Sequence, residues 1–413
     1  MSSIQKHTDP FRNSARDRAE HIRYVSAIFS AAQSWPTNSA SLGNCLIEAG
    51  FFNTNRGKEI LRPVNAAEID TLKHRCNCKA RGNDWSRFFL LYQPELEHST
   101  NQGGISEILV RQVSDTCFAG IIVLGLEEEE EPTSTTRSTF LGGANSRFSL
   151  LPIGAHRNGF VANCVFEAGC CVMNNSIIYQ TYFGKKSVML NCGTVSRSSL
   201  LDSLDSSSGS PFSVGNECKL SIELGPETGG RKVELFAEST LIDVARALKL
   251  SPPAFPMNAE GGEDIYKFAS CSAPVNIFHE RSYAADCPSI SNVYLSEGAF
   301  IDAASHVQNV TLLPEACVRS GSIVKDVLLQ WKAVIENGAH VNNSLLMECS
   351  TAETASIVNS SVIGPDSHVG GGETQHTLLG PNANAHHQSL MIGVIWPLGR
   401  GNVGKLNNYC CVQ

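Results

Sequence analysis

Aliphatic residues recur at a fixed long period through the last third of the chain. Within each of three columns the step is 17 residues, and neighbouring columns are offset by six, six and five residues. Neither a helical stripe nor a hairpin repeats at this distance, so the period indicates one structural unit stacked on the next. We expect each unit to be a coil of three short strands, each with an inward aliphatic side chain. The columns are Leu295, Leu312, Leu329, Leu346 and Ile363; Ile301, Val318, Ile335 and Ala352; and Val307, Val324, Val341 and Val358.

Small and polar residues form further columns at the same step. Small side chains suit the crowded interior of a narrow prism. Asn and Asp tolerate positive φ and bond to the local backbone, so they suit a corner that repeats once per coil. The small columns are Ala299, Ala316, Ala333 and Ser350, and Ser305, Ser322, Ala339 and Ser356; the polar ladder is Asn292, Asn309, Asp326 and Asn343.

These columns predict a mainly β fold, a parallel β-helix with triangular coils of about 17 residues, together with a small helical N-terminal region and one helical insertion. Neighbouring coils should pair at a strand spacing of roughly 4.8 Å. A single coil buries nothing, so the stack itself must supply the stability.

The coil pattern is regular only in part of the chain. After Ile363 the step shortens by one position, giving Leu379. Helical patterns are expected over residues 14–35, after the capping-box sequence that begins at Asn65, and over 239–250. Residues 105–126 alternate and read as strands. We therefore divide the chain into an N-terminal helical and mixed region (1–104), a first irregular stack (105–222) with a flexible acidic insertion (127–139), a helix and linker (223–288), the regular β-helix (289–404) and a tail (405–413).

Composition narrows the functional classes. The formal net charge is −8, and no basic stripe is available to neutralise phosphates, which argues against nucleic-acid binding. The chain has 15 cysteines, and those in strand-like sequence are expected to be small buried hydrophobes in a reducing, cytoplasmic compartment. They include Cys164, Cys170, Cys171, Cys192, Cys218, Cys317 and Cys349.

Membrane signals are sparse. No secretory signal and no apolar run of transmembrane length are seen. The last four residues, which begin at Cys410, match a prenylation box, although so short a match also arises by chance. Contact with a membrane is expected only if Cys410 is prenylated.

The strongest candidate for chemistry is the run His386-His387-Gln388-Ser389. It follows Ala385, an expected inward position, so it should lie at a coil corner. A histidine there could act as general base on a hydroxyl or amine, because its ordinary pKa is near 6.5. Gln388 and Ser389 could donate hydrogen bonds to a substrate carbonyl or oxyanion. The structural alternative is a pair of histidines that cap backbone carbonyls.

Three residues further along are candidates for substrate binding. Arg400, in a glycine-rich segment, could hold a phosphate or carboxylate through two hydrogen bonds. Asn402 lies between glycines that allow a ligand to approach the backbone closely. Trp396 could stack on a substrate, although packing in the core or an interface is the simpler expectation.

A metal site is the weaker hypothesis. Three neutral imidazoles could hold zinc with one position open, and the candidates are His368, His376, His386 and His387. Their steps of eight, ten and one residues do not follow the coil, except that His368 and His386 are about one coil apart. We therefore predict no metal.

The sequence also resembles a known family. A six-residue aliphatic period with small residues between resembles the hexapeptide-repeat, left-handed β-helix superfamily of trimeric LpxA-like proteins. Within it, the chain resembles an uncharacterised family, the domain of unknown function 4954, over about residues 60–404. The motifs that carry this resemblance are LRPVNAAEI (61–69), DWS (84–86), FAG (118–120), LG (124–125), ETGGR (227–231), LGP (379–381), HHQSL (386–390), WP (396–397) and GRGNVG (399–404).

The resemblance implies a left-handed helix and a homotrimer, but the family has no established reaction. The chain departs from it in two ways. The helical insertion after the ETGGR segment is short, and family members continue with further coils where this chain stops nine residues after Gly404.

Relatives in the superfamily include acyl-CoA-dependent acyltransferases, sugar-nucleotide enzymes and γ-type carbonic anhydrases. We therefore expect a transferase that moves an acyl group from CoA to a small-molecule sugar or amino acceptor, with His386 or His387 as base and Arg400 as an anion contact. The alternatives are a non-catalytic scaffold and a sugar-nucleotide-binding protein. A polar cleft at residues 386–402, with a histidine side chain in it, would favour the enzyme.

Overall fold

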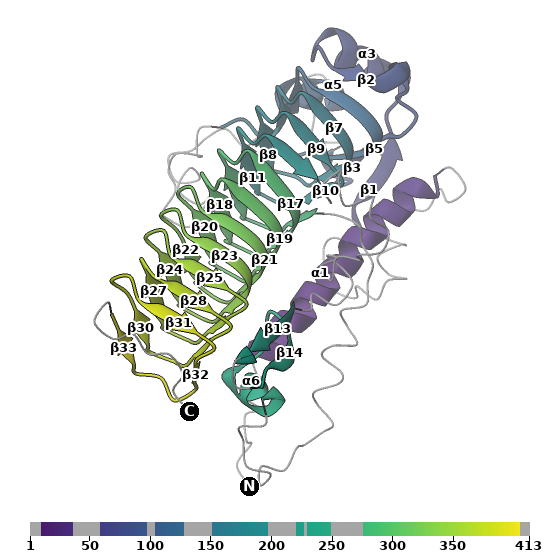
Figure 1. Ribbon diagram of the computed structural model, residues 1–413. Coiled ribbons are helices and arrows are strands. Elements are labelled where there is room, and N and C mark those ends of the chain that lie inside the picture. The colour runs from purple at the N-terminus through teal and green to yellow at the C-terminus, as the bar shows by residue number, and fades with distance from the viewer. Residues whose placement is uncertain are drawn as a thin grey trace, which may run out of the picture.

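The computed structural model describes residues 10–35, 58–96, 104–127, 151–196, 220–226, 229–248 and 276–404. Most of these residues belong to one parallel β-solenoid with three walls (Figure 1). In each turn the chain runs along wall 1, turns a corner to wall 2 and turns again to wall 3. Wall 1 has twelve strands, one for each turn.

The strands divide among the walls as follows. Wall 1 is formed by β4 (Val113–Ser114), β6 (Gly154–His156), β8 (Cys171–Met173), β11 (Val188–Leu190), β16 (Tyr283–Ala285), β18 (Phe300–Asp302), β20 (Cys317–Arg319), β22 (Val334–Ile335), β24 (Thr351–Glu353), β27 (His368–Gly370), β30 (Asn384–Ala385) and β33 (Asn402–Val403). Six long strands bend from wall 2 into wall 3: β5 (Cys117–Gly125), β7 (Phe160–Phe166), β17 (Ser289–Leu295), β19 (His306–Leu312), β21 (Ile323–Leu329) and β23 (His340–Leu346).

Shorter strands complete walls 2 and 3. Wall 2 also contains β2 (Lys79–Ala80), β9 (Ile177–Tyr179), β12 (Thr194–Ser196), β25 (Ile357–Asn359), β28 (Glu373–Gln375) and β31 (Leu390–Ile392). Wall 3 also contains β3 (Phe88–Tyr92), β10 (Thr181–Phe183), β15 (Asn276–Phe278), β26 (Val362–Ile363), β29 (Leu378–Leu379) and β32 (Ile395–Trp396), and β1 (Ile60–Pro63) pairs antiparallel with β3.

The aliphatic columns line the interior of the solenoid, as predicted. Leu295 pairs with Leu312, Leu312 with Leu329, and Leu329 with Leu346, all in parallel register. All four side chains are fully buried. The predicted fold class, a mainly β solenoid with triangular coils of the predicted length, is confirmed.

The predicted polar ladder marks the corner between walls 2 and 3. Asn292, Asn309, Asp326 and Asn343 all adopt left-handed φ values, between 45° and 55°. Nδ2 of Asn292 donates to Oδ1 of Asn309 at 2.9 Å, and Nδ2 of Asn309 donates to Oδ1 of Asp326 at 2.6 Å. Stacking of like side chains thus satisfies polar groups along the edge of the prism.

Helices close the N-terminal end of the prism. They are α3 (Ala66–His74) and α5 (Gly104–Gln112), with the short 3-10 helix η2 (Arg81–Asn83) nearby. Residues 105–112 were predicted as strand, which is wrong. The mixed apolar pattern there has helical spacing, and it places Ile108 and Leu109 in the core.

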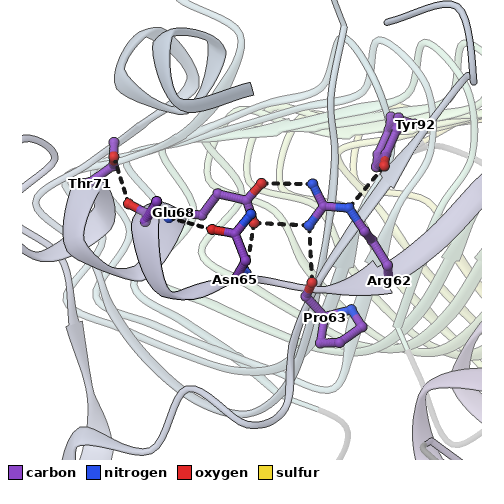
Figure 2. Close-up of polar contacts among 7 residues, drawn as sticks. Arg62, Pro63, Asn65, Glu68, Thr71 and Tyr92 are labelled. Atoms are coloured by element: carbon purple, nitrogen blue, oxygen red, sulfur yellow. Dashed lines mark hydrogen bonds and ion pairs between the residues drawn. The ribbon is translucent and has the colours of Figure 1, made fainter. Parts of the chain in front are cut away.

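The predicted capping box begins α3 (Figure 2). Oδ1 of Asn65 accepts from the backbone of Glu68, and Oε2 of Glu68 accepts from the backbone of Asn65 at 2.8 Å. The guanidinium of Arg62 makes two hydrogen bonds to the carboxylate of Glu68, at 2.7 and 2.9 Å. This buried carboxylate therefore has both its charge and its oxygen atoms satisfied.

Two segments cover the outer face of wall 3. Helix α1 (Pro10–Gln33) lies along its N-terminal half and buries Ile22, Val25 and Ile28 against it (Figure 1). The second segment leaves the solenoid after β12 and returns at β15. Its described parts are the hairpin of β13 (Leu220–Leu224) with β14 (Arg231–Leu235) and the helix α6 (Leu241–Ala247), which pack on the C-terminal half.

These observations revise the predicted linker. Residues 276–285 already form β15 and β16 in the stack, so the regular solenoid resumes earlier than the predicted residue 289. The helices predicted over 14–35 and 239–250 are present as α1 and α6. Residues 128–139 of the acidic insertion, and the tail with Cys410, lie outside the described residues.

Most of the predicted buried cysteines are indeed buried: Cys164, Cys170, Cys171, Cys192 and Cys317. Burial raises the pKa of the Cys164 thiol to about 12, so it stays protonated at neutral pH. Cys349 is exposed, contrary to the prediction, because it lies at an outer corner with φ of 56°. Cys218 lies outside the described residues. Across the described part of the chain, no helix is long and apolar enough to span a membrane.

Replacing Leu329 with Ala should lower the free energy of unfolding by about 2–5 kcal/mol, because it opens a cavity in a fully buried column. Urea denaturation followed by circular dichroism measures the change. Lys325→Ala, on the exposed face of the same strand, should change stability by less than about 0.5 kcal/mol. Equal effects of the two substitutions would contradict the assignment of the interior.

Candidate functional site

A groove of about 1220 Å³ lies at the corner between walls 1 and 2, in the last coils of the solenoid. We call it the corner groove. Three consecutive corners form it, those that follow β24, β27 and β30. Its ionisable lining residues are Glu353, His368, Glu373, His386 and His387.

The groove exists because the middle corner is one residue too short. Three residues separate Glu353 from Ile357, and three separate His386 from Leu390. Only two, Gly371 and Gly372, separate Gly370 from Glu373, although these residues pair in register with Glu353 and Ile357. The shortening of the repeat that the sequence shows after Ile363 is therefore located at this corner.

Glycines deepen the notch that the missing residue leaves. Residues 370–372 are all glycine, so no side chain projects from the short corner. Gly371 has φ of 63°, a left-handed conformation that glycine adopts without strain. The corners above and below keep their side chains and become the two sides of the groove.

The first side of the groove carries a histidine–carboxylate pair. Nε2 of His368 lies 3.3 Å from Oε1 of Glu353. At this distance the two side chains form an ion pair when the imidazole is protonated. A Cβ atom at Gly370 would stand 2.9 Å from Nε2 of His368, so this glycine makes room for the imidazole.

Sequence reasoning missed Glu353 altogether and considered His368 only as a metal ligand. The spacing of the sequence nevertheless contained a signal for the His368–Glu353 pair. Glu353 and Gly370 are one coil apart and pair in register, and His368 is two positions before that glycine on the same outward face of wall 1.

The second side of the groove carries the predicted histidine pair. The rings of His386 and His387 lie 4.1 Å apart between centroids, at 59° to each other. Nε2 of His386 lies 2.6 Å from Oδ1 of Asn402 on the next coil. Because the amide oxygen accepts, Nδ1 of His386 is left as its basic nitrogen. His386 is half-buried and His387 is exposed.

Gln388 and Ser389 continue this corner. The backbone of Gln388 donates to the carbonyl of Gly371 at 2.8 Å, and its side chain is exposed. The Ser389 side chain continues the predicted small-residue column and is only 3% exposed. Its hydroxyl lies 2.6 Å from the position that a Cβ of Gly372 would take, and it has no hydrogen-bond partner among the described residues.

Two predicted binding residues lie away from the groove. The indole of Trp396 closes the C-terminal end of the prism, where Nε1 donates to the carbonyl of Gly399 at 3.1 Å and the ring packs on Gly401. Arg400 is exposed at the turn that follows, and its backbone donates to the carbonyl of Pro381 at 3.0 Å. Neither lines the corner groove, whereas His386, His387, Gln388 and Ser389 do, and Asn402 contacts it through His386.

Three of the four histidines of the metal hypothesis line the corner groove, and the fourth lies elsewhere. His376 lies at the corner between walls 2 and 3, and its Nδ1 is 2.8 Å from the carbonyl oxygen of Glu223 in the insertion. Within the described ranges, no group of three or more His, Cys, Asp or Glu residues is arranged to hold a metal ion.

Comparisons with known family models, curated proteins and solved structures gave no match to this chain. The resemblance to the domain of unknown function 4954 therefore stays a prediction. The geometry of the corner groove carries the functional argument.

Gly370→Ala should separate His368 from Glu353, because the added methyl group would stand too close to the imidazole. The ¹⁵N chemical shifts of the His368 ring report whether its contact with Glu353 is lost. Gly404→Ala is the matched control, since its Cβ meets nothing closer than 3.8 Å. Unchanged ring shifts of His368 in Gly370→Ala would contradict the described geometry.

Proposed function

We propose that the corner groove is the acceptor site of a hexapeptide-repeat transferase, which moves an acyl group from a CoA thioester to a small molecule. The observation that carries the proposal is the His386 imidazole, which lines a polar groove and is held by Asn402 so that Nδ1 is its basic nitrogen. A scaffold would require neither a hollow at this corner nor an oriented imidazole. The solenoid fold is compatible with this class of enzyme, although a fold alone does not assign a reaction.

In this proposal His386 acts as a general base. Nδ1 takes a proton from the acceptor nucleophile as that nucleophile attacks the thioester carbonyl, and the imidazolium returns the proton to the departing thiolate. Positioned bases of this kind contribute rate factors of about 10² to 10⁴. Asn402 contributes by fixing the tautomer and orientation of the ring, as partners of catalytic histidines commonly do.

We include in this proposal the homotrimer that the family resemblance implies. Its support is a column of outward residues on wall 2 in which aliphatic side chains remain exposed. Ile323, Ile357 and Leu390 are 38%, 45% and 44% exposed. Ile357 and Leu390 also line the corner groove, so a second copy on wall 2 would deepen it. Light scattering of the full chain should give three times the monomer mass, and a monomer at all concentrations would contradict this part.

His386→Asn should lower kcat for acyl transfer by about 10²- to 10⁴-fold, because it removes the base. The assay follows release of free CoA from acetyl-CoA in the presence of candidate acceptors. His74→Asn is the matched control, since His74 is an exposed histidine of α3 that does not line the groove. Equal rates for the two variants would contradict the role of His386.

A further inference from the structure

The charges in the corner groove point to the class of acceptor. We propose that the acceptor is a primary amine, bound as its ammonium ion between Glu353 and Glu373. This inference rests on the proposed function for its catalytic step, but the binding itself is independent of any acyl donor.

The groove has carboxylates and imidazoles but no fixed cation. Among the described residues that line it, none is Lys or Arg, so with neutral imidazoles the lining carries the two negative charges of Glu353 and Glu373. The basic residue nearest along the wall 1 column, Arg319, is already paired with Glu336 at 2.5 Å. A phosphate or carboxylate group would find no partner of opposite charge here, whereas an ammonium group would find two.

Each carboxylate has a polar neighbour at one of its two oxygen atoms. Oε1 of Glu353 faces Nε2 of His368 at 3.3 Å, and Oε1 of Glu373 accepts from Nε2 of Gln375. Within the described part of the chain, no side chain donates to the second oxygen of either residue. Each carboxylate thus has one oxygen near a polar side chain and keeps the other for a ligand.

A further polar group of the groove lacks a partner. Ser389 lines the groove, is only 3% exposed, and has an Oγ atom with no hydrogen-bond partner among the described residues. An unsatisfied buried hydroxyl destabilises the fold. The Oγ atom is closed off from solvent, so the acceptors that an ammonium ion meets at the groove surface are the free oxygens of the two carboxylates.

The same groove explains how the amine would become reactive. The bound ammonium loses one proton to Nδ1 of His386, and the neutral nitrogen attacks the carbonyl carbon of the thioester. The C–N bond forms, the C–S bond breaks, and the imidazolium returns its proton to the departing thiolate. The second proton that the nitrogen sheds as the amide forms goes to water, so the products are an amide, a free thiol and one proton.

The test measures binding of D-glucosamine and D-glucose to the full chain by calorimetry, without an acyl donor and at a pH where the amine is protonated. The two sugars differ only in an ammonium group or a hydroxyl group at one carbon. Glucosamine should bind at least tenfold more tightly than glucose. Glu353→Gln should remove at least that tenfold preference, because it keeps the shape of the side chain and removes its charge. Glu315→Gln, which changes a 65% exposed carboxylate outside the groove, should leave binding unchanged.

The outcomes separate this inference from the proposed function. Equal binding of the two sugars, no binding of glucosamine up to its solubility limit, or an undiminished preference in Glu353→Gln would overturn the amine site. Such a result would leave acyl transfer to a hydroxyl open to the CoA-release assay. Selective, Glu353-dependent binding of glucosamine without release of CoA from acetyl-CoA would support the amine site and overturn the transferase.

Discussion

The register of aliphatic side chains between neighbouring coils is the constraint on which the whole molecule depends. Each inward residue stacks on its equivalent in the coils before and after it, as Leu312 does between Leu295 and Leu329. Side chains alternate between the two faces of a strand, so a slip of one residue within a wall would turn the interior outward. A change in coil length is therefore tolerated only at a corner, where no inward column is displaced.

Two departures from the regular coil illustrate this constraint. The long insertion leaves and rejoins the stack between β12 and β15, at the corner between walls 2 and 3. The deletion of one residue falls at Gly371, between walls 1 and 2, and Val358 and Thr374 still pair in register just beyond it. The insertion covers wall 3 with an apolar hairpin, whereas the deletion leaves the groove that carries the histidines. The same tolerance at corners thus yields a covering element at one place and a candidate site at another.

The sequence was informative wherever side chains repeat. The aliphatic columns and the Asn ladder each follow from the stacking of one coil on the next, so both could be predicted from the spacing alone. The helix at 104–112 was missed because it occurs once and its short apolar pattern resembles that of a strand. The resumption of the stack at Asn276 was missed because it follows a segment with no coil pattern.

The candidate site could be predicted only in part, because several of its contacts do not repeat from coil to coil. His386 and His387 were found because they follow an inward alanine. Trp396 and Arg400 are near them in sequence but belong to another wall and to the end of the prism. Glu353 is remote in sequence, and it meets His368 only because Gly370 leaves space for the ring. Such a contact depends on side-chain directions at a corner, which spacing does not specify.

The most direct measurement adds back the one residue by which the corner at Gly371 is shorter than its neighbours. Inserting one alanine between Gly371 and Gly372 restores the corner to the length of its neighbours, so the register of the stack should survive while the notch fills. The inserted protein should keep the urea midpoint of the parent and lose glucosamine binding, whereas an alanine inserted after Gly338, at a corner outside the groove, should leave binding intact. Retention of glucosamine binding in the first variant, with its fold unchanged, would contradict the claim that the shortened corner creates the site.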